Sequence, residues 1–248
     1  PLTQHIHSDG STRRLREYVE DGGYRCLQRL AAGLAPKEVQ RLVTEAGLRG
    51  RGGGGFPTGA KWSFVPMGPD APKPKYIVAN GDEMEPGTFK DRVLMEGDPH
   101  GLVEGMILAG YAIDAAVGYI FLRGEYHLSA QRLTEAIAEA YAAGYLGTPL
   151  PGTGFRFDLH LHASAGRYIC GEETAMIESL EGKKGQPRLK PPFPAGAGLY
   201  GCPTTVNNLE TIAIVPTAFK VGCEEFSKLS TLHGQKDGGT RLYGSGCA

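Results

Sequence analysis

The sequence has no surplus of charge of either sign. Its 248 residues include 26 Lys and Arg against 27 Asp and Glu, which leaves a formal net charge of −1. Proteins dedicated to nucleic acid neutralise phosphates with a surplus of basic residues. Segments that stay disordered through charge repulsion also need an unbalanced charge. The composition therefore argues against a nucleic-acid-binding protein and against a disordered acidic or basic one.

Cysteines are few, and no two of them form a C-x-x-C pair. An odd number spread along the chain is not the pattern of a disulfide framework. It also lacks the closely spaced thiolates of an iron–sulfur cluster. We therefore expect free thiols and no metal bound by the five cysteines, Cys26, Cys170, Cys202, Cys223 and Cys247.

Long apolar runs and hydrolytic motifs are also missing. The longest apolar stretch, 106–113, ends at Asp114 and is far shorter than the roughly 20 residues that cross a bilayer. We expect no direct membrane insertion. No G-x-S-x-G motif and no cysteine–histidine nucleophile pattern occurs. Several polar loops without a hydrolytic nucleophile are typical of a protein whose cofactor does the chemistry.

Glycine is what the sequence has in excess. It contains 37 Gly and 17 Pro, yet 41% of its residues are hydrophobic. A chain of this length can bury about 70% of its surface, enough for a large core. We therefore expect the glycines in ordered loops, where the backbone approaches a neighbour closely.

Hydrophobic periodicity predicts alternating strands and helices. Such an order implies crossover connections and an α/β fold with a parallel sheet. In the third strand Leu159 and Leu161 alternate with His160 and His162, which predicts an edge strand or one polar face. The predicted strands are 76–79, 117–122 and 155–163, and the predicted helices are 36–46, 100–115, 129–144, 172–180 and 204–219. Residues 1–35 are only weakly periodic, and 81–98 is interpreted as a loop with short turns.

The loop 50–59 formally matches G-x-G-x-x-G. The dinucleotide fingerprint needs a preceding strand, whereas a helix precedes this loop, so we reject that interpretation. The phosphate-binding loop is also excluded, because Ala60 stands where it needs lysine. Bare backbone amides beside Arg51 and Lys61 can wrap a planar or phosphorylated ligand, with a flexible hinge as the alternative.

Three further polar segments leave alternatives open. Residues 80–87 follow a buried strand, so their carboxylates could bind sugar hydroxyls, bind a metal or face solvent. Glu172 and Glu173 open a helix and could serve only its dipole. A run of four cations is either solvated or a phosphate clamp: Lys183, Lys184, Arg188 and Lys190. The pair His160 and His162 is either a metal pair or a solvated face.

Six motifs in register carry a resemblance to a known family. They are the segments 47–62 (GLRGRGGGGFPTGAKW), 80–92 (NGDEMEPGTFKDR), 168–175 (YICGEETA), 179–182 (SLEG), 187–194 (PRLKPPFP) and 206–211 (VNNLET). Together they cover nearly the whole chain. The sequence resembles the NADH-oxidising flavoprotein component of respiratory complex I, known in bacteria as the F subunit.

The resemblance implies FMN held noncovalently in a Rossmann-like domain with helices on both faces of a parallel sheet. It implies flavin contacts from Gly50, Arg51, Gly52, Lys61, Asn80, Asp82, Gly171, Glu172, Asn207 and Asn208. It implies NADH contacts from Phe56, Phe64, Glu85, Glu173, Lys190 and Phe193. No side chain is expected to act as a catalytic acid or base, because the hydride passes between the two cofactors, and no metal ligand is assigned.

The resemblance also implies three segments. Residues 1–58 form a mostly helical and loop N-terminal region that ends in the glycine-rich loop, 59–228 form the FMN- and NADH-binding domain, and 229–248 begin a small ubiquitin-like β-domain. The family continues into a helical domain with the cysteines of a 4Fe-4S cluster. We therefore expect a truncated or incomplete protein without that cluster.

The implied function is transfer of a hydride from NADH to FMN, then of single electrons to an iron–sulfur chain leading to quinone. The implied partners are the 2Fe-2S thioredoxin-like E subunit and the large iron–sulfur G subunit of complex I, at the cytoplasmic side of the bacterial inner membrane. Two alternatives stay open. One is the diaphorase component of an NAD-linked hydrogenase or formate dehydrogenase, and the other is a nucleotide-binding scaffold without turnover.

Overall fold

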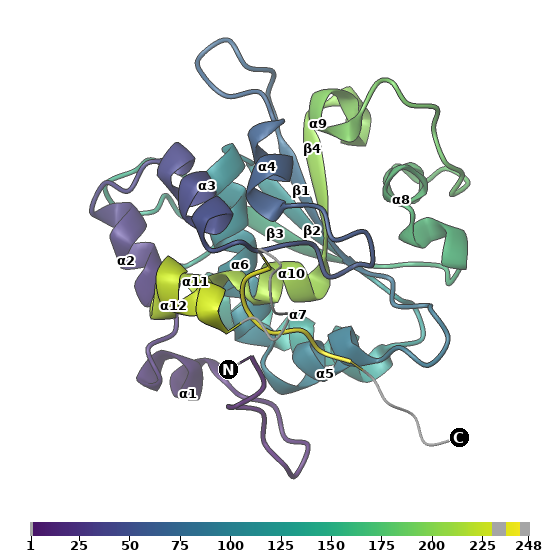
Figure 1. Ribbon diagram of the computed structural model, residues 1–248. Helices are drawn as coiled ribbons and strands as arrows, with labels where there is room; N and C mark the ends of the chain where they lie inside the picture. The colour runs from purple at the N-terminus through teal and green to yellow at the C-terminus, as the bar shows by residue number, and fades with distance from the viewer. Residues whose placement is uncertain (1, 230–236, 244–248) are drawn as a thin grey trace.

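A parallel four-stranded sheet lies at the centre of the molecule (Figure 1). The computed structural model describes residues 2–229 and 237–243. The strand order is β3-β2-β1-β4, with every neighbouring pair parallel, which confirms the predicted α/β class. The strands are β1 (Tyr76–Gly81), β2 (Val117–Leu122), β3 (Asp158–Ala163) and β4 (Thr204–Asn208).

The edge position expected for the third strand is confirmed, but that strand is shorter than predicted. β3 begins at Asp158 rather than at residue 155. The carbonyls of Phe155 and Phe157 accept hydrogen bonds from Leu150 and Gly147 in the preceding loop. Those residues therefore pair with the loop and not with β2.

The prediction of a single helix over 204–219 is wrong. Residues 204–208 form β4, which pairs in register with β1, and a helix begins only at Leu209. The two threonines and Val206 are β-branched and buried, which suits a strand inside a layered fold. Asn208 then caps the new helix, accepting a hydrogen bond from the Thr211 amide.

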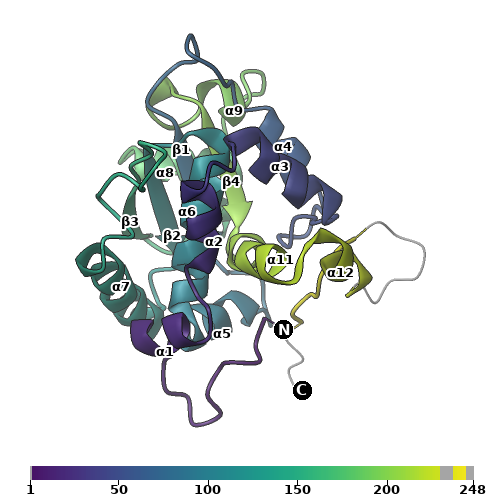
Figure 2. The same ribbon diagram turned by 90° about the vertical axis from the view of Figure 1, so that its left-hand side faces the viewer.

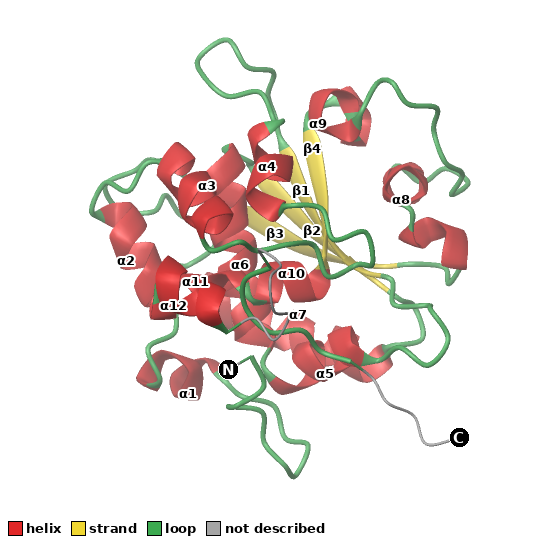
Figure 3. Ribbon diagram, viewed as in Figure 1, coloured by secondary structure: helices red, strands yellow, loops and turns green. Residues whose placement is uncertain are grey.

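Helices cover both faces of the sheet, as expected (Figures 1 and 3). On one face the long apolar helix α6 (Pro99–Ile113) packs with α3 (Pro36–Glu45) and α10 (Leu209–Ala213). On the other face α8 (Glu173–Leu180) covers a smaller core. Alternation along β1 explains the division, because Ile77 and Ala79 join the large core while Val78 joins the smaller one.

Several helices were not predicted from the sequence. The segment interpreted as a loop over 81–98 contains α5 (Lys90–Gly97), and the weakly periodic N-terminal residues form α1 (Leu15–Glu20) and α2 (Arg25–Ala31). All are short, so their apolar period is hard to detect. The other helices are α4 (Thr58–Ser63), α7 (His127–Ala142), α9 (Pro194–Ala197), α11 (Val215–Val221) and α12 (Cys223–Lys228). Two 3-10 turns, η1 (Tyr168–Gly171) and η2 (Leu199–Gly201), complete them.

The N-terminal region shares the main core. Helix α2 lies on the outer side of α6, away from the sheet (Figure 2). Tyr18 of α1 is buried and donates a hydrogen bond to the buried carboxylate of Glu104 in α6. Tyr24 likewise contacts the ring of His100 at 2.9 Å. These polar contacts between buried groups fix the N-terminal region onto α6.

The C-terminal residues of the described chain return to the glycine-rich loop. The amide of Gly238 donates to the carbonyl of Gly47 at 2.8 Å, and a methyl group at Gly238 would lie 1.6 Å from the carbonyl oxygen of Ala46. Of the β-domain expected to begin over 229–248, residues 230–236 and 244–248 lie outside the described residues. Within the described ranges no helix is long and apolar enough to cross a membrane.

Candidate functional site

A cavity of about 720 Å³ opens at the carboxyl ends of β1 and β4. From β1 the sheet continues through β2 to β3 on one side, whereas β4 is added on the other. The place where neighbouring strands are added on opposite sides is called the topological switch point of the sheet. Ligands of open parallel sheets bind there, outside the carboxyl ends of the strands. Asn80 at the end of β1 and Asn208 at the end of β4 are register partners and both line the cavity. The fold thus brings together two asparagines that lie 128 positions apart.

The glycine-rich loop forms one wall. A methyl group at Gly52 would lie 3.1 Å from Cβ of Asn208, a tight contact, so the loop backbone passes close to Asn208. Gly53 has φ of +101°, a conformation that favours glycine, and has open space around it. The amide of Arg51 donates to the Thr211 hydroxyl at 2.8 Å, which anchors the loop to α10.

The Arg51 side chain points away from solvent. Its guanidinium is 1% exposed and donates to Asp237 at 2.7 Å and to the carbonyl of Gly238 at 2.8 Å. Arg51 therefore lines the cavity while its charge is neutralised by the C-terminal segment. Three residues of that segment, Arg241, Leu242 and Tyr243, also line the cavity.

The acidic loop after β1 forms a second wall. Asn80 donates to the carbonyl of Gly171 at 2.9 Å and accepts from the amide of Asp82 at 3.1 Å. One Asp82 oxygen accepts from the Ser164 hydroxyl at 3.1 Å, and the other is buried without a hydrogen-bond partner among the residues that the structure describes. Burial raises the pKa of the Asp82 carboxyl to about 6, against the lowering effect of Ser164.

Glu172 is the N-cap of α8 and lines the cavity. One of its oxygens accepts from the amides of Thr174 and Ala175, both at 2.9 Å, which satisfies two free donors of the helix. The other oxygen pairs with Lys190 at 3.2 Å. Burial opposes ionisation, but the hydrogen bonds from Thr174 and its neighbours outweigh it and lower the pKa of Glu172.

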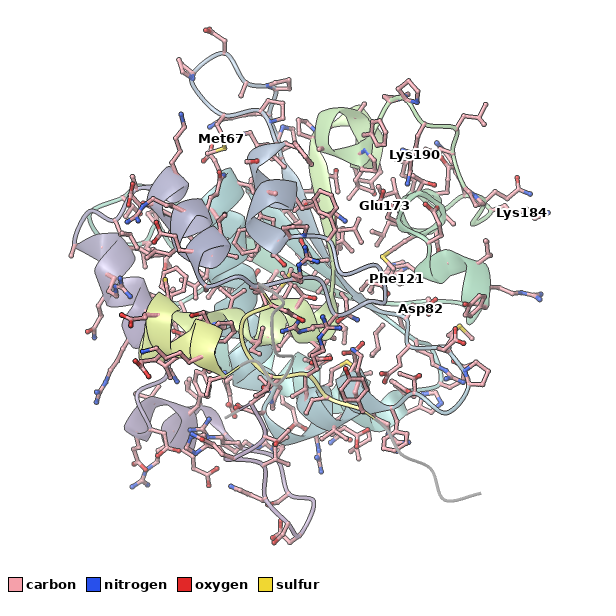
Figure 4. All side chains as sticks on the ribbon, viewed as in Figure 1. Met67, Asp82, Phe121, Glu173, Lys184 and Lys190 are labelled. Atoms are coloured by element: carbon pink, nitrogen blue, oxygen red, sulfur yellow. The ribbon has the colours of Figure 1, made fainter. Side chains whose placement is uncertain are left out.

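A chain of ion pairs extends from Glu172 through Lys190 to Glu173, and Figure 4 labels the last two. Lys190 also pairs with Glu173 at 2.7 Å, and Glu173 pairs with Lys61 at 3.1 Å. Burial raises the pKa of the Glu173 carboxyl, but Lys61 and Lys190 outweigh it and hold that pKa below its usual range. Lys61, Glu173 and Lys190 do not line the cavity itself, and they lie beside it.

The three predicted aromatic contacts are exposed. Phe56 and Phe64 lie with ring centroids 6.1 Å apart, and Phe193 is the N-cap residue of α9. Their exposed fractions are 51%, 62% and 62%, high for phenylalanine. Exposed apolar rings near a polar cavity are the kind of feature that marks a binding surface.

Besides Lys61, two other predicted flavin contacts do not line the cavity. Gly50 pairs with the carbonyl of Phe56 at 2.9 Å and closes the base of the glycine-rich loop. Asn207 is buried and accepts from the indole of Trp62 at 3.1 Å. Seven predicted flavin contacts do line it, namely Arg51, Gly52, Asn80, Asp82, Gly171, Glu172 and Asn208, and so does the predicted NADH contact Glu85.

Sequence reasoning missed a charged cluster on the cavity floor. Lys90 pairs with Asp91 at 2.7 Å and with Glu210 at 3.0 Å, and Asn208 donates to Asp91 at 2.9 Å. These four residues, Lys90, Asp91, Asn208 and Glu210, all line the cavity. Recognising β4 would have pointed to Glu210, because it follows a strand that ends at the switch point. The hydroxyl of Tyr168 donates a hydrogen bond to Glu85 at 2.8 Å. Tyr168 lies in the motif 168–175, but it was not predicted as a site residue.

The histidine pair and the cation run lie outside the lining of the cavity. His160 and His162 lie on β3 against the aromatic rings of Tyr119 and Phe121. Arg188 pairs with Glu178 and with Glu181, and Lys183 also pairs with Glu181 at 2.7 Å. Among residues 2–229 and 237–243, no group of three or more His, Cys, Asp or Glu is arranged to hold a metal ion.

Comparison with known proteins agrees with this geometry. Residues 43–217 match the family model described as the Nuo51 FMN-binding domain. The chain is 54% identical over 229 residues to the NADH-quinone oxidoreductase F 2 subunit of Rhizobium meliloti, covering 92% of this chain and 53% of that protein. It is 51% identical to the NADH-quinone oxidoreductase F subunit of Escherichia coli, covering 98% of this chain and 54% of that protein.

A solved structure is similar as well. It is an NAD+-reducing NiFe hydrogenase in the H2-reduced state, with a TM-score of 0.76 and 38% identity over 93% of this chain and 38% of that chain. The present chain spans about half the length of the curated relatives it matches. The matched family model covers most of the chain, including the glycine-rich loop and the loops after β1 and β4. The chain therefore belongs to the family of Nuo51 FMN-binding domains.

Proposed function

We propose that this chain is the NADH-oxidising, FMN-binding part of a respiratory NADH:quinone oxidoreductase. The observation that carries the proposal is the cavity at the switch point, enclosed by a glycine-rich loop and two register-paired asparagines. Family membership supports the same conclusion. Because the chain spans about half of its relatives, the activity of the whole protein is inferred from them.

The cavity fits a flavin mononucleotide in size and in chemistry. A volume of about 720 Å³ lies within the range of small-molecule sites. Glycines 52 and 53 let the backbone approach a flat ring. The unpartnered oxygen of Asp82 can accept a hydrogen bond from a ring N–H, and Lys90 and Arg241, although each is paired with carboxylates, bring charged N–H donors to the cavity lining for a phosphate.

We assign the residues to two groups. In the flavin group, Gly50 and Asn207 support the walls of the cavity rather than touch the ligand. The flavin group is the set predicted from the sequence: Gly50, Arg51, Gly52, Lys61, Asn80, Asp82, Gly171, Glu172, Asn207 and Asn208. The NADH group includes Glu85 in the cavity lining and residues outside that lining, among them the ion pair of Glu173 with Lys190: Phe56, Phe64, Glu85, Glu173, Lys190 and Phe193. Lys61 belongs to both groups by its place in that chain.

The protein binds and orients, and the cofactor supplies the chemistry. Bound FMN would supply the capacity to take a hydride from NADH and to pass the electrons on singly. The exposed phenyl rings offer flat faces on which the rings of NADH can stack. Glu173 places a carboxylate where a 2′-phosphate would be repelled, which favours NADH over NADPH. No side chain need act as an acid or base on the nicotinamide.

We further propose the setting of this module. Its partners are the iron–sulfur E and G subunits of the same complex, at the cytoplasmic side of a bacterial inner membrane. The 4Fe-4S cluster of the family is assigned to the part of the relatives that this chain does not match. We propose the same three segments as the resemblance implies, 1–58, 59–228 and 229–248. Residues from 237–243 contribute a wall to the cavity of the middle segment.

The alternative is the diaphorase component of an NAD-reducing hydrogenase. The structural similarity to that enzyme favours it, since 93% of this chain is covered. Identity distinguishes the two: 38% to the hydrogenase chain against 51% to the oxidoreductase relative from Escherichia coli. The quinone-linked complex therefore has the stronger support.

The test is a visible absorption spectrum of the purified chain, followed by anaerobic NADH. Flavin bands that bleach on addition of NADH are the expected result. Bands that persist would contradict the NADH site while leaving the flavin site intact. A folded, colourless protein that takes up no added FMN would overturn the proposal and favour a scaffold without turnover.

A further inference from the structure

Asp82 and Ser164 come from different strands and meet at the rim of the cavity. Asp82 follows β1, and Ser164 follows the edge strand β3. Each is 7% exposed. Their contact joins two loops 82 positions apart, and only Asp82 lines the cavity.

The Ser164 hydroxyl has a fixed direction. Its oxygen accepts from the amide of Gly166 at 3.3 Å, so its hydrogen is left for Asp82 at 3.1 Å. The Ser164 backbone is also held, because its amide donates to the carbonyl of Leu122 at 2.8 Å. Gly124 packs so closely that a methyl group there would lie 2.3 Å from the carbonyl oxygen of Ser164. The serine is therefore a rigid donor.

The carboxylate is held from a second side. The Asp82 amide donates to Asn80, which ties its backbone to the end of β1. One carboxylate oxygen is bound by Ser164, and the other has no partner within the described residues. A buried, unpartnered acceptor beside a cavity is costly unless a ligand or water satisfies it.

We propose that Ser164 is a positioning residue of the flavin site, whose hydroxyl fixes Asp82 ionised and leaves its second oxygen as the acceptor for a ring N–H. The inference rests on the proposed function for the identity of the ligand. Asp82 touches the cofactor, and Ser164 acts only through Asp82.

The charges around Asp82 set the direction of the effect. Burial is the largest influence on its pKa and raises it, and Ser164 lowers it. A serine hydroxyl bound to a carboxylate favours the ionised form, so losing it raises the pKa further. The other titratable and charged groups facing Asp82 are Arg123 and Glu125 after β2, its neighbour Glu83, and Cys170 in η1.

The experiment measures the dissociation constant of FMN against pH, from about pH 5 to about pH 8. We expect affinity of the unaltered chain to fall as pH drops through about 6, where Asp82 becomes protonated. Ser164→Ala should move that midpoint upward by about one pH unit, and Ser164→Thr, which keeps the hydroxyl, should restore it.

Ser129→Ala is the matched control. Ser129 is also a buried serine bound to a carboxylate, Glu96 at 2.9 Å, but it lies on α7 away from the cavity. It should leave the midpoint of FMN binding unchanged. An unshifted midpoint in Ser164→Ala, or an equal shift in Ser129→Ala, would overturn the proposal.

A second measurement separates this inference from the proposed function. The Asp82 carboxyl carbon can be titrated by NMR in the cofactor-free chain. If the unaltered chain binds no FMN at any pH, the proposed function fails. The effect of Ser164 on the Asp82 carboxyl is then judged by the NMR titration alone. A higher pKa of Asp82 in Ser164→Ala supports the contact, and an unchanged pKa refutes it.

Discussion

Glu173 illustrates how a residue at the site is held by charge. Two lysines from different segments, Lys61 and Lys190, fix its carboxylate at 3.1 Å and 2.7 Å. Lys61 lies in α4, whereas Lys190 lies in the loop before α9. The carboxylate is therefore in place before any nucleotide arrives. Pre-positioned charge of this kind selects among ligands more than it adds to affinity.

Replacing Glu173 by glutamine should weaken selectivity against NADPH. The neutral amide no longer repels a 2′-phosphate, so we expect the ratio of kcat/KM for NADH over NADPH to fall roughly tenfold. Steady-state kinetics with both nucleotides measure this ratio. Glu178→Gln, on the same helix but paired with Arg188, is the control and should keep the ratio. An unchanged ratio in Glu173→Gln would refute the assignment.

Asp82 should make the cofactor-free protein less stable as pH rises. Its folded pKa of about 6 lies above the ordinary value of 3.8. Between those values the folded state binds a proton that the unfolded state does not, so the free energy of unfolding falls as pH rises. The full loss is up to about 3 kcal/mol.

Urea unfolding of the cofactor-free chain between about pH 4 and about pH 7 tests this effect. The Asp82→Asn variant carries no such proton and should lack that part of the pH dependence. It should therefore gain stability relative to the unaltered chain as pH rises. Parallel pH profiles for the two proteins would contradict the prediction.

At the scale of elements, α6 and α10 pack closely against each other in the helical layer that covers one face of the sheet. Gly105 of α6 lies against the backbone of α10, where a methyl group would come within 2.2 Å of the carbonyl oxygen of Ile212. Such close approach needs glycine, although glycine weakens an isolated helix by about 1 kcal/mol relative to alanine. Here the tertiary contact outweighs the helix propensity.

Gly105→Ala should destabilise the protein by about 2 to 4 kcal/mol, because the clash involves backbone that cannot move alone. Gly101→Ala in the same helix is the matched control. The nearest atoms to a methyl group there belong to Asp98 at 3.5 Å, an ordinary contact. It should be neutral or stabilising by up to about 1 kcal/mol. Equal melting temperatures for the two variants would rule out the packing argument.

For the whole molecule, the decisive contact joins the glycine-rich loop to the last described segment. Arg51 belongs to the loop and Asp237 to that segment, and both side chains are at most 3% exposed. A buried ion pair is strongly destabilised when one partner is removed, because the other charge stays buried. The segment 237–243 is thus part of the cavity wall and of the stability of the glycine-rich loop.

Asp237→Ala should cost about 3 to 5 kcal/mol of folding stability and weaken FMN binding. Chemical unfolding and a flavin titration measure the two effects. Glu225→Ala removes an exposed ion pair with Lys228 on α12 and should leave folding stability nearly unchanged. If Asp237→Ala is as stable as Glu225→Ala, the segment is dispensable.

Local hydrophobic periodicity was sufficient to predict the helices and strands that have a strong apolar pattern. α6 and β2 were predicted nearly to the residue, because long apolar or β-branched runs carry their own signal. β4 was missed because its five residues are mostly polar and lead straight into a helix. Its identity as a strand comes from pairing with β1, which no local pattern encodes.

By itself the sequence determined the class of the fold, its family and several of the polar residues of the cavity, since motifs keep their order along the chain. Only the tertiary structure decided which of those residues meet. It brought Asn80 beside Asn208, Ser164 onto Asp82, and Asp237 onto Arg51. Each pair is separated by more than 80 positions, and contacts at such separations depend on strand order and packing rather than on local propensity.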